Sequence, residues 1–108
     1  MTLYADARRP QSVAVLPAAG GEARVITSLP PEYPLDAHVV PENVTLTAED
    51  GIEFNNQLFL PPDMRPGERR AALIFIHGGS RRQMLLGYHH RHFYHMAYAM
   101  NQFWANQG

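Results

Sequence analysis

The alternation of polar and apolar residues is clearest over 44–60, and it predicts a β-hairpin. Apolar side chains occupy every second position of 44–48 with threonines between them, as expected for a strand that buries one face. Asp50-Gly51 follows, and this dipeptide between two strand patterns favours a tight turn whose central residues both take a positive φ. The return strand over 52–60 has a polar middle, so part of the hairpin is expected to face water.

A second hairpin is expected nearer the N-terminus. The segments 12–16 and 24–28 are short and rich in β-branched residues, and Gly20-Gly21 lies in the turn between them. Three prolines then fall within 30–34. Proline fixes φ and lacks an amide donor, so 30–36 is predicted to be an extended linker and the boundary between two parts of the chain.

Residues 71–76 read Ala-Ala-Leu-Ile-Phe-Ile and are apolar on both faces, which is typical of a central strand in a parallel sheet. The segment 93–107 has helical period, and its apolar stripe is expected to pack on that strand. A parallel strand needs a parallel neighbour beyond the crossover helix. The pattern therefore predicts an α/β fold of which the chain holds the opening part. The stripe consists of Phe93, Met96, Ala97, Met100, Phe103 and Trp104.

Length and composition narrow the function classes. The chain has 108 residues, which allows one small domain, and 45% of them are hydrophobic. A net charge of −1 excludes an acidic disordered tail and a basic nucleic-acid arm. No apolar run approaches the ~18 residues of a membrane span, and the absence of cysteine excludes disulfides and thiolate metal sites. The first ten residues do not resemble a signal peptide, and the sequence does not indicate a cellular compartment.

Two stretches together resemble a known family. They are Ala-Leu-Ile-Phe-Ile-His-Gly-Gly at 72–79 and the hairpin from Val-Thr-Leu-Thr-Ala-Glu-Asp-Gly at 44–51 to Leu-Phe-Leu-Pro-Pro at 58–62. They are similar to the start of the catalytic domain of prolyl oligopeptidase-family serine peptidases. The resemblance implies an incomplete α/β-hydrolase fold over 37–108, made of the opening β-hairpin, the first central parallel strand and the first helix. It also implies that 1–36 are the end of the family's β-propeller and the linker.

The resemblance further implies an activity. The family hydrolyses peptide bonds through an acyl-enzyme without a cofactor. The partners implied here are a peptide substrate and the remainder of the catalytic domain, not a nucleic acid or a membrane. The family's nucleophile lies in Gly-x-Ser-x-Gly, followed by an acid and a histidine. That motif is absent here, where Gly78-Gly79-Ser80 runs into two arginines, so the chain alone is predicted to be inactive.

His77-Gly78-Gly79 is the loop expected to carry chemistry. Acyl transfer builds negative charge on a carbonyl oxygen, and bare glycine amides at the end of a strand can approach that oxygen. Some branches of the family carry a tyrosine at the position of His77, and many carry a proline at that of Ser80. These departures leave open whether the His77 ring or only the backbone donates to the oxygen. Further candidates to line the cleft are Ser80, Arg81, His89 and His92.

Two other functions remain open. An esterase or lipase of the same fold would carry the same His-Gly-Gly loop. Alternatively, the chain is a small histidine-rich protein that binds a metal or a partner. His89, His92 and His95 are three residues apart, so a helix would bring them near one face, where neutral imidazoles can hold zinc; no acidic residue follows Glu68 to complete such a site. With its apolar stripe uncovered, the isolated chain is also expected to self-associate.

Overall fold

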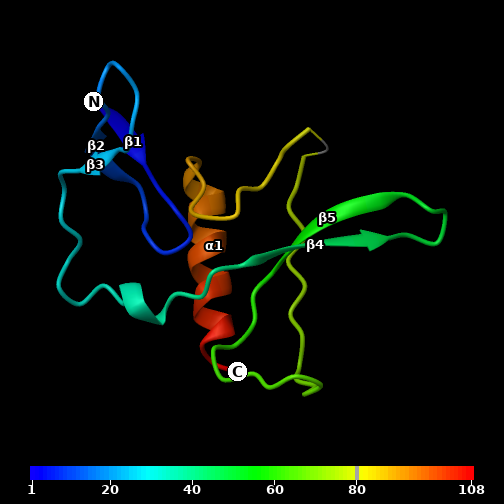
Figure 1. Cartoon of the computed structure of the whole chain (residues 1–108). Coiled ribbons are helices and arrows are strands. Elements are labelled where there is room, and N and C mark those ends of the chain that lie inside the picture. Colours follow the sequence, from blue (N-terminus) through cyan, green and yellow to red (C-terminus); the bar gives the residue numbers. More distant parts are fainter. Residues whose placement is uncertain (80) are drawn as a thin grey trace.

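A computed structural model describes residues 1–79 and 81–108. Two small antiparallel sheets lie on either side of a single helix in Figure 1. No helix among the described residues is both long and apolar enough to cross a membrane. In chain order the elements are strands β1 (Thr2–Tyr4), β2 (Ser12–Val15) and β3 (Arg24–Val25), the short 3-10 helix η1 (Leu35–Ala37), strands β4 (Glu42–Thr47) and β5 (Glu53–Leu58), and helix α1 (His92–Ala105).

The hairpin predicted over 44–60 is confirmed as β4 and β5, which pair antiparallel along their whole length. Its turn differs from the expected one, because Gly51 alone has a positive φ, of 86°. The amide of Gly51 donates to the carbonyl of Ala48, and the amide of Ala48 donates to the carbonyl of Ile52. This is a type I turn followed by one left-handed glycine, a common three-residue connection. Asp50 keeps a negative φ, and its carboxylate accepts the amide of Ile52 at 3.1 Å.

The N-terminal hairpin is confirmed, but it belongs to a larger sheet than expected. β2 pairs antiparallel with β3, as the β-branched residues predicted, and β1 pairs with the other edge of β2. β1 has only three residues, too few to produce a readable period. β2 is therefore the central strand, and its Ala14 is fully buried.

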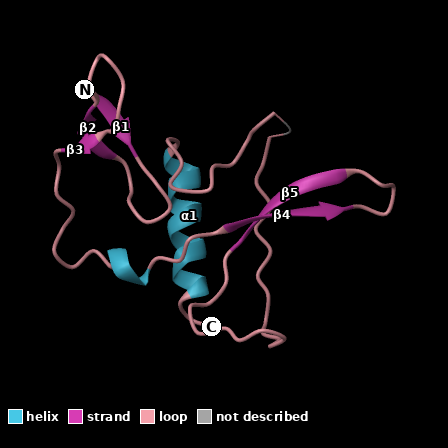
Figure 2. Ribbon diagram, viewed as in Figure 1, coloured by secondary structure: helices cyan, strands magenta, loops and turns pink. Residues whose placement is uncertain are grey.

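The α/β-hydrolase fold predicted over 37–108 is wrong for this structure, because its central parallel strand is missing. All strand pairs among the described residues are antiparallel, and 71–76 forms no strand (Figure 2). The side chains of Ile74 and Ile76 are 83% and 84% exposed. A strand requires hydrogen bonds to a neighbour, and no described strand pairs with this stretch. The observed class is two small antiparallel sheets with one C-terminal helix.

Helix α1 forms close to the predicted place, but of the stripe predicted to be buried only Ala97 faces inward. Phe93 and Phe103 of the expected buried stripe are 67% and 55% exposed, and both methionines of the helix and Trp104 are exposed as well. The helix therefore shows its largest apolar side chains to solvent and turns its tyrosines inward. The buried face consists of Tyr94, Ala97, Tyr98, Gln102 and Ala105.

The tyrosine face is buried because loop carbonyls and amides find their partners there. Tyr98 is 1% exposed, and its hydroxyl donates to the carbonyl of Ala7 at 2.7 Å. One turn later, Gln102 pairs with Val39 as a neighbouring strand would. Its Oε1 accepts the Val39 amide at 2.8 Å, and its Nε2 donates to the Val39 carbonyl at 2.7 Å. Burial is the main cause that raises the pKa of Tyr98 to about 12, so its hydroxyl stays a donor at neutral pH.

A second polar cluster ties the linker to the loop before α1. The Tyr88 hydroxyl lies 2.7 Å from the Tyr33 hydroxyl and 2.7 Å from Nε2 of His38. Nδ1 of His38 lies 2.8 Å from the carbonyl of Pro34, which can only accept, so Nδ1 donates to it. Burial, and after it the hydrogen bond with Tyr33, raises the pKa of Tyr88 well above its usual value. The segment 30–36 is therefore held in place, and the prediction that it is extended is wrong: the Tyr33 amide donates to the Pro30 carbonyl at 3.0 Å in a turn, and η1 follows.

This polar core leaves the molecule open. The Cα radius of gyration is 16.1 Å, compared with ~13 Å for a compact domain of about 100 residues. The excess arises because α1 packs its tyrosines on loops, while the exposed stripe of α1 and the stretch 71–76 remain uncovered.

Gly87 provides a direct test of the packing around the N-terminal segment. A methyl group on Gly87 would lie 2.8 Å and 2.9 Å from the carbonyl carbon and oxygen of Asp6, and backbone atoms cannot move aside as a flexible side chain can. We expect Gly87→Ala to lower the free energy of unfolding by about 1–3 kcal/mol in urea denaturation. Gly78→Ala is the control, because its methyl would meet only the Tyr94 hydroxyl, at 4.0 Å. Equal stability of Gly87→Ala and the wild type would contradict this close approach.

The exposed stripe of α1 predicts self-association. We expect sedimentation velocity to show dimers or larger species, because an exposed apolar patch of this kind is rare on monomers. Phe103→Lys should shift the distribution towards monomer, because it removes a large apolar side chain and places a cation near the C-terminal end of a helix, where it is tolerated. Gln107→Lys adds the same charge outside the stripe and should leave the distribution unchanged. A wild-type chain that stays monomeric at every concentration tested would rule out this expectation.

Candidate functional site

The loop at 77–79 offers two backbone donors. Gly78 and Gly79 are both exposed, and no described residue accepts a hydrogen bond from either amide. Gly79 has a φ of 84°, in the region that favours glycine. Its carbonyl accepts the amide of Arg82 at 3.1 Å, so the chain turns back here. Two neighbouring amides are therefore open to an acceptor from outside the described chain.

Helix α1 holds this loop through Tyr94. The Tyr94 side chain is 4% exposed, and its hydroxyl donates to the carbonyl of Gly78 at 3.0 Å. Tyr94 lies in the first turn of α1 and belongs to the buried face of that helix. The sequence predicted that the end of a parallel strand would position the glycines. In the structure a helix does so, from 16 residues further along the chain.

Charged and aromatic side chains lie around the glycine pair. The guanidinium of Arg82 is 5.1 Å from the centroid of the Tyr94 ring, within the range of a cation–π contact. Its Nε would lie 3.0 Å from a methyl group on Gly79, so the arginine side chain covers the α-carbon of that glycine. The ring centroids of His77 and His89 lie 6.4 Å and 5.4 Å from that of Tyr94. A cation, a phenol and two imidazoles thus surround the two glycines, whose amides have no acceptor among the described residues.

The other predicted cleft residues fall in different places. His89 is buried within this setting, whereas Arg81 and His92 are exposed. Ser80 lies outside the described residues. The predicted helical alignment of His89 with His92 and His95 is wrong, because α1 begins only at His92. Within 1–79 and 81–108, no group of three or more histidine, aspartate or glutamate side chains is placed to hold a metal ion.

His89 acts as a neutral hydrogen-bond acceptor. Its Nδ1 accepts the amide of Arg91 at 2.9 Å, and its ring stacks on that of His90 with 4.2 Å between centroids. Burial, and after it the neighbouring His90, lowers the pKa of His89 below its usual value. Burial also lowers the pKa of His95, whose ring centroid lies 4.7 Å from that of Tyr88. Protonation of His89 at Nδ1 would remove the acceptor of the Arg91 amide.

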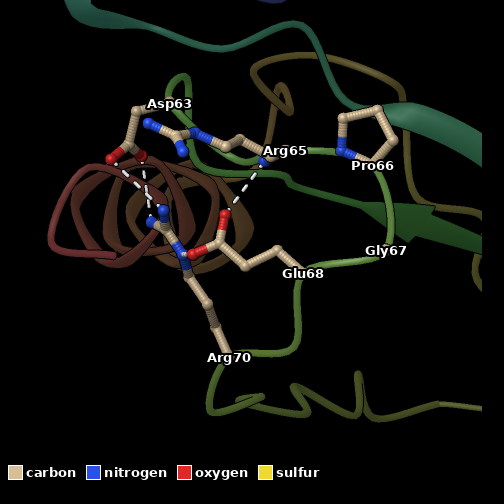
Figure 3. Close-up of a pocket in the computed structure, with 6 residues that line it drawn as sticks. All are labelled: Asp63, Arg65, Pro66, Gly67, Glu68 and Arg70. Atoms are coloured by element: carbon tan, nitrogen blue, oxygen red, sulfur yellow. Dashed lines mark hydrogen bonds and ion pairs between the residues drawn. The ribbon is translucent and has the colours of Figure 1, made fainter.

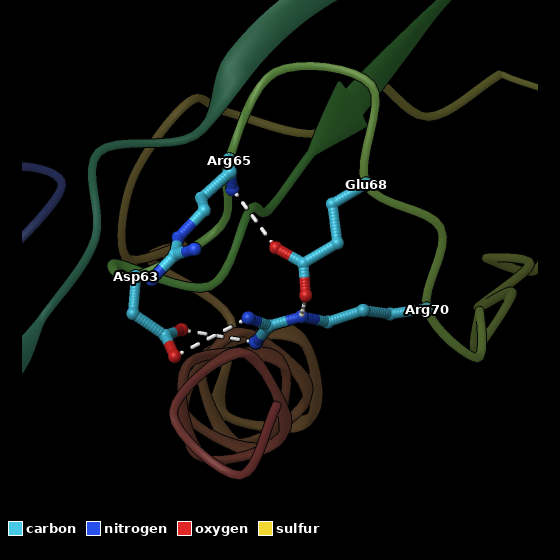
Figure 4. Close-up of polar contacts among 4 residues, drawn as sticks. All are labelled: Asp63, Arg65, Glu68 and Arg70. Atoms are coloured by element: carbon cyan, nitrogen blue, oxygen red, sulfur yellow. Dashed lines mark hydrogen bonds and ion pairs between the residues drawn. The ribbon is translucent and has the colours of Figure 1, made fainter.

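A hollow of about 510 Å³ lies elsewhere, in the loop after β5 (Figure 3). Both of its carboxylates already pair with Arg70. Arg70 binds Asp63 through two hydrogen bonds, of 2.9 Å and 3.2 Å, and its Nε donates to Glu68 at 2.9 Å (Figure 4). The hydrogen bonds from Arg70 are the main cause that lowers the pKa of both carboxyl groups. An anion would have to displace a carboxylate to reach Arg70, so the Arg70 pairs serve to close the loop. The lining residues are Asp63, Arg65, Pro66, Gly67, Glu68 and Arg70.

Comparisons with protein-family models, with curated proteins and with solved structures found no match to this chain. The functional interpretation therefore rests on the geometry of the glycine loop and its neighbours. At the loop, two amides without an acceptor among the described residues lie beside Arg82, which forms no ion pair with any described residue.

The sequence pattern locates the glycine pair but not the residue that supports it. In the sequence Tyr94 reads as a packing aromatic, because nothing local connects it with Gly78. One available signal is the recurrence of Tyr94, Tyr98 and Gln102 at intervals of four, which places three side chains with polar ends in one row along a helix. Such a row indicates a face that buries polar contacts rather than apolar surface.

The histidines predict that stability depends on pH. The folded-state pKa values of His89 and His95 lie below the ordinary value of 6.5, so the unfolded chain takes up protons first as the pH falls. Stability is therefore complete above about pH 6.5 and decreases as the pH falls below it. We expect the melting temperature to decrease from pH 7 to pH 5, and to do so less in His89→Asn, whose side-chain oxygen can replace Nδ1 as acceptor without titrating. The role given to His89 is contradicted if the melting temperatures of His89→Asn and the wild type depend on pH in the same way.

Proposed function

We propose that residues 77–79 bind the carbonyl oxygen of the scissile bond in a serine-type peptidase. The observation that carries this proposal is the pair of exposed amides of Gly78 and Gly79, for which no described residue supplies an acceptor. The resemblance of the flanking sequence to prolyl oligopeptidase-family peptidases supports the same function. Open amides on residues without a β-carbon suit an oxygen that gains negative charge during the reaction.

The chemistry requires few groups from this loop. A histidine takes the proton of a serine hydroxyl as its oxygen attacks the carbonyl carbon of the peptide, and an electron pair moves onto the carbonyl oxygen. An amide about 3 Å from that oxygen stabilises the charge by about 3 kcal/mol. The carbon–nitrogen bond then breaks as the histidine passes that proton to the leaving nitrogen, and water, deprotonated by the same histidine, releases the acyl group from the serine. The loop supplies only the amides, and they act on the charged intermediate rather than on the substrate at rest.

Arg82 adds fixed positive charge to the same place. Its side chain lies against the α-carbon of Gly79 and carries a cationic guanidinium. A cation near the two amides favours the same negatively charged oxygen. The electrostatic setting of the loop therefore agrees with the role proposed for its backbone.

The sequence contains no Gly-x-Ser-x-Gly. In this proposal, residues outside these 108 supply the serine, the acid and the histidine. Those residues are the loop's partner in the active enzyme, and the substrate is a peptide. An esterase would use the same amides. Hydrolysis of an amide-bond substrate, and not of esters alone, distinguishes the peptidase.

The test uses the complete product of the gene that encodes these residues. We expect a fluorophosphonate probe to label a serine in it and fluorogenic peptides to be hydrolysed. Gly79→Pro removes the amide proton and cannot keep the φ of 84°, so we expect kcat to fall about 100-fold or more. Gly67→Pro is the matched control, because Gly67 has a φ of 79° and open space around it.

Gly67→Pro should lose comparable stability but keep kcat within about two-fold of the wild type, because a remote turn adds nothing to the transition state. The proposal is refuted if the wild type neither reacts with the probe nor cleaves peptides. It is also refuted if the two proline variants lose activity equally, since the loss would then reflect folding alone.

A further inference from the structure

We infer that Tyr94 is a positioning residue that aims the Gly79 amide by holding the carbonyl of the same peptide unit. The inference rests on the proposed function of the loop and adds the residue that sets the direction of its donor. It starts from one contact, the hydrogen bond of 3.0 Å from the Tyr94 hydroxyl to the carbonyl oxygen of Gly78.

The carbonyl of Gly78 and the amide of Gly79 belong to one rigid plane. The peptide bond between them is trans, so its C=O and N–H groups point in opposite directions. A group that fixes the carbonyl therefore also fixes the amide. With its carbonyl bound to Tyr94, this peptide directs the Gly79 N–H away from α1.

The glycine pair needs such an anchor. Glycine has the widest range of φ and ψ, and the preceding stretch 71–76 is not held in a sheet. The exposed His77 ring also lies 3.3 Å from the Gly78 oxygen, but it belongs to the loop itself and moves with it. The bond from the Arg82 amide to the Gly79 carbonyl restrains the next peptide plane, not this one.

Tyr94 is well suited to be the fixed point. Its side chain is 4% exposed and belongs to a helix of 14 residues. The Arg82 guanidinium lies over its ring, and the rings of Phe93 and His89 approach it to 5.1 Å and 5.4 Å between centroids. The position of the hydroxyl is thus set by the helix and its neighbours rather than by the loop.

The same contact strengthens the donor. A carbonyl that accepts a hydrogen bond polarises its peptide, and the amide of that peptide becomes a better donor by roughly 10–30%. Orientation and polarisation both act on the charge that develops during the reaction. A loss of Tyr94 should therefore lower kcat and leave KM nearly unchanged.

The experiment compares Tyr94→Phe with Tyr98→Phe in the complete gene product. Each variant removes one hydroxyl that donates from the buried face of α1 to a loop carbonyl, and the Tyr98 bond to Ala7 is 2.7 Å long. Both should lose similar stability. We expect Tyr94→Phe to lower kcat for a peptide substrate by about 10-fold with KM within about two-fold, and Tyr98→Phe to keep the wild-type kcat.

A second readout does not depend on activity. In protein labelled with [15N]glycine, the Gly79 amide signal is identified by its loss in Gly79→Pro. We expect that signal to shift and its order parameter to fall in Tyr94→Phe, and to stay unchanged in Tyr98→Phe. These changes would report the release of one particular peptide plane rather than a general loss of stability.

The outcomes separate the two proposals. An unchanged Gly79 signal in Tyr94→Phe, or an equal loss of kcat in both tyrosine variants, overturns the inference about Tyr94. The peptidase proposal is tested separately, by the activity of Gly79→Pro. If the wild type cleaves no peptide, the peptidase proposal fails. The Gly79 amide signal alone then shows whether Tyr94 orients the peptide bond between Gly78 and Gly79.

Discussion

Buried tyrosine hydroxyls hold this chain together. Tyr88, Tyr94 and Tyr98 bond respectively to the linker, to the glycine loop and to the N-terminal segment. Each such bond contributes about 1 kcal/mol net, whereas a buried hydroxyl left without a partner costs about 1–3 kcal/mol. The rings also bring apolar area into a core whose other buried hydrophobic residues, among those described, are alanines. Two phenols of α1 and a third in the loop before it thus fix three segments that no sheet supports.

Local patterns in the sequence predict local structure, and they fail where the outcome depends on distant partners. Alternation and helical period depend on residues a few positions apart, so the β4–β5 hairpin and α1 are both found. The predicted orientation of α1 is wrong because it assumes that the largest apolar side chains face inward. The loops around α1 present carbonyl groups instead of an apolar surface. Tyrosine hydroxyls can donate hydrogen bonds to these carbonyls, so the tyrosines face inward. The strand expected at 71–76 is absent for a related reason: apolar and β-branched residues favour an extended chain, but only a neighbour makes it a strand.

The candidate site, too, is predictable from the sequence only where it depends on local properties. Gly78 and Gly79 are visible in the sequence because the freedom of glycine and its bare amide are properties of the residue itself. The contacts of Tyr94 with Gly78 and with Arg82 arise only when α1 docks with its tyrosine face towards the loop, so no spacing rule anticipates them. Sequence analysis therefore finds the groups able to donate, while the direction in which they donate is a property of the folded chain.

The bond between Tyr98 and Ala7 also sets an order of events during synthesis. The two residues are 91 positions apart, and Gln102 reaches the same carbonyl from 95 positions away. A ribosome that adds ~5–20 residues per second releases the N-terminal segment several seconds before its partners, whereas a β-hairpin closes within about 10 microseconds. The nascent chain thus carries Ala7 without its helical partners until α1 emerges from the exit tunnel, although the hairpins that lie between them can already have closed.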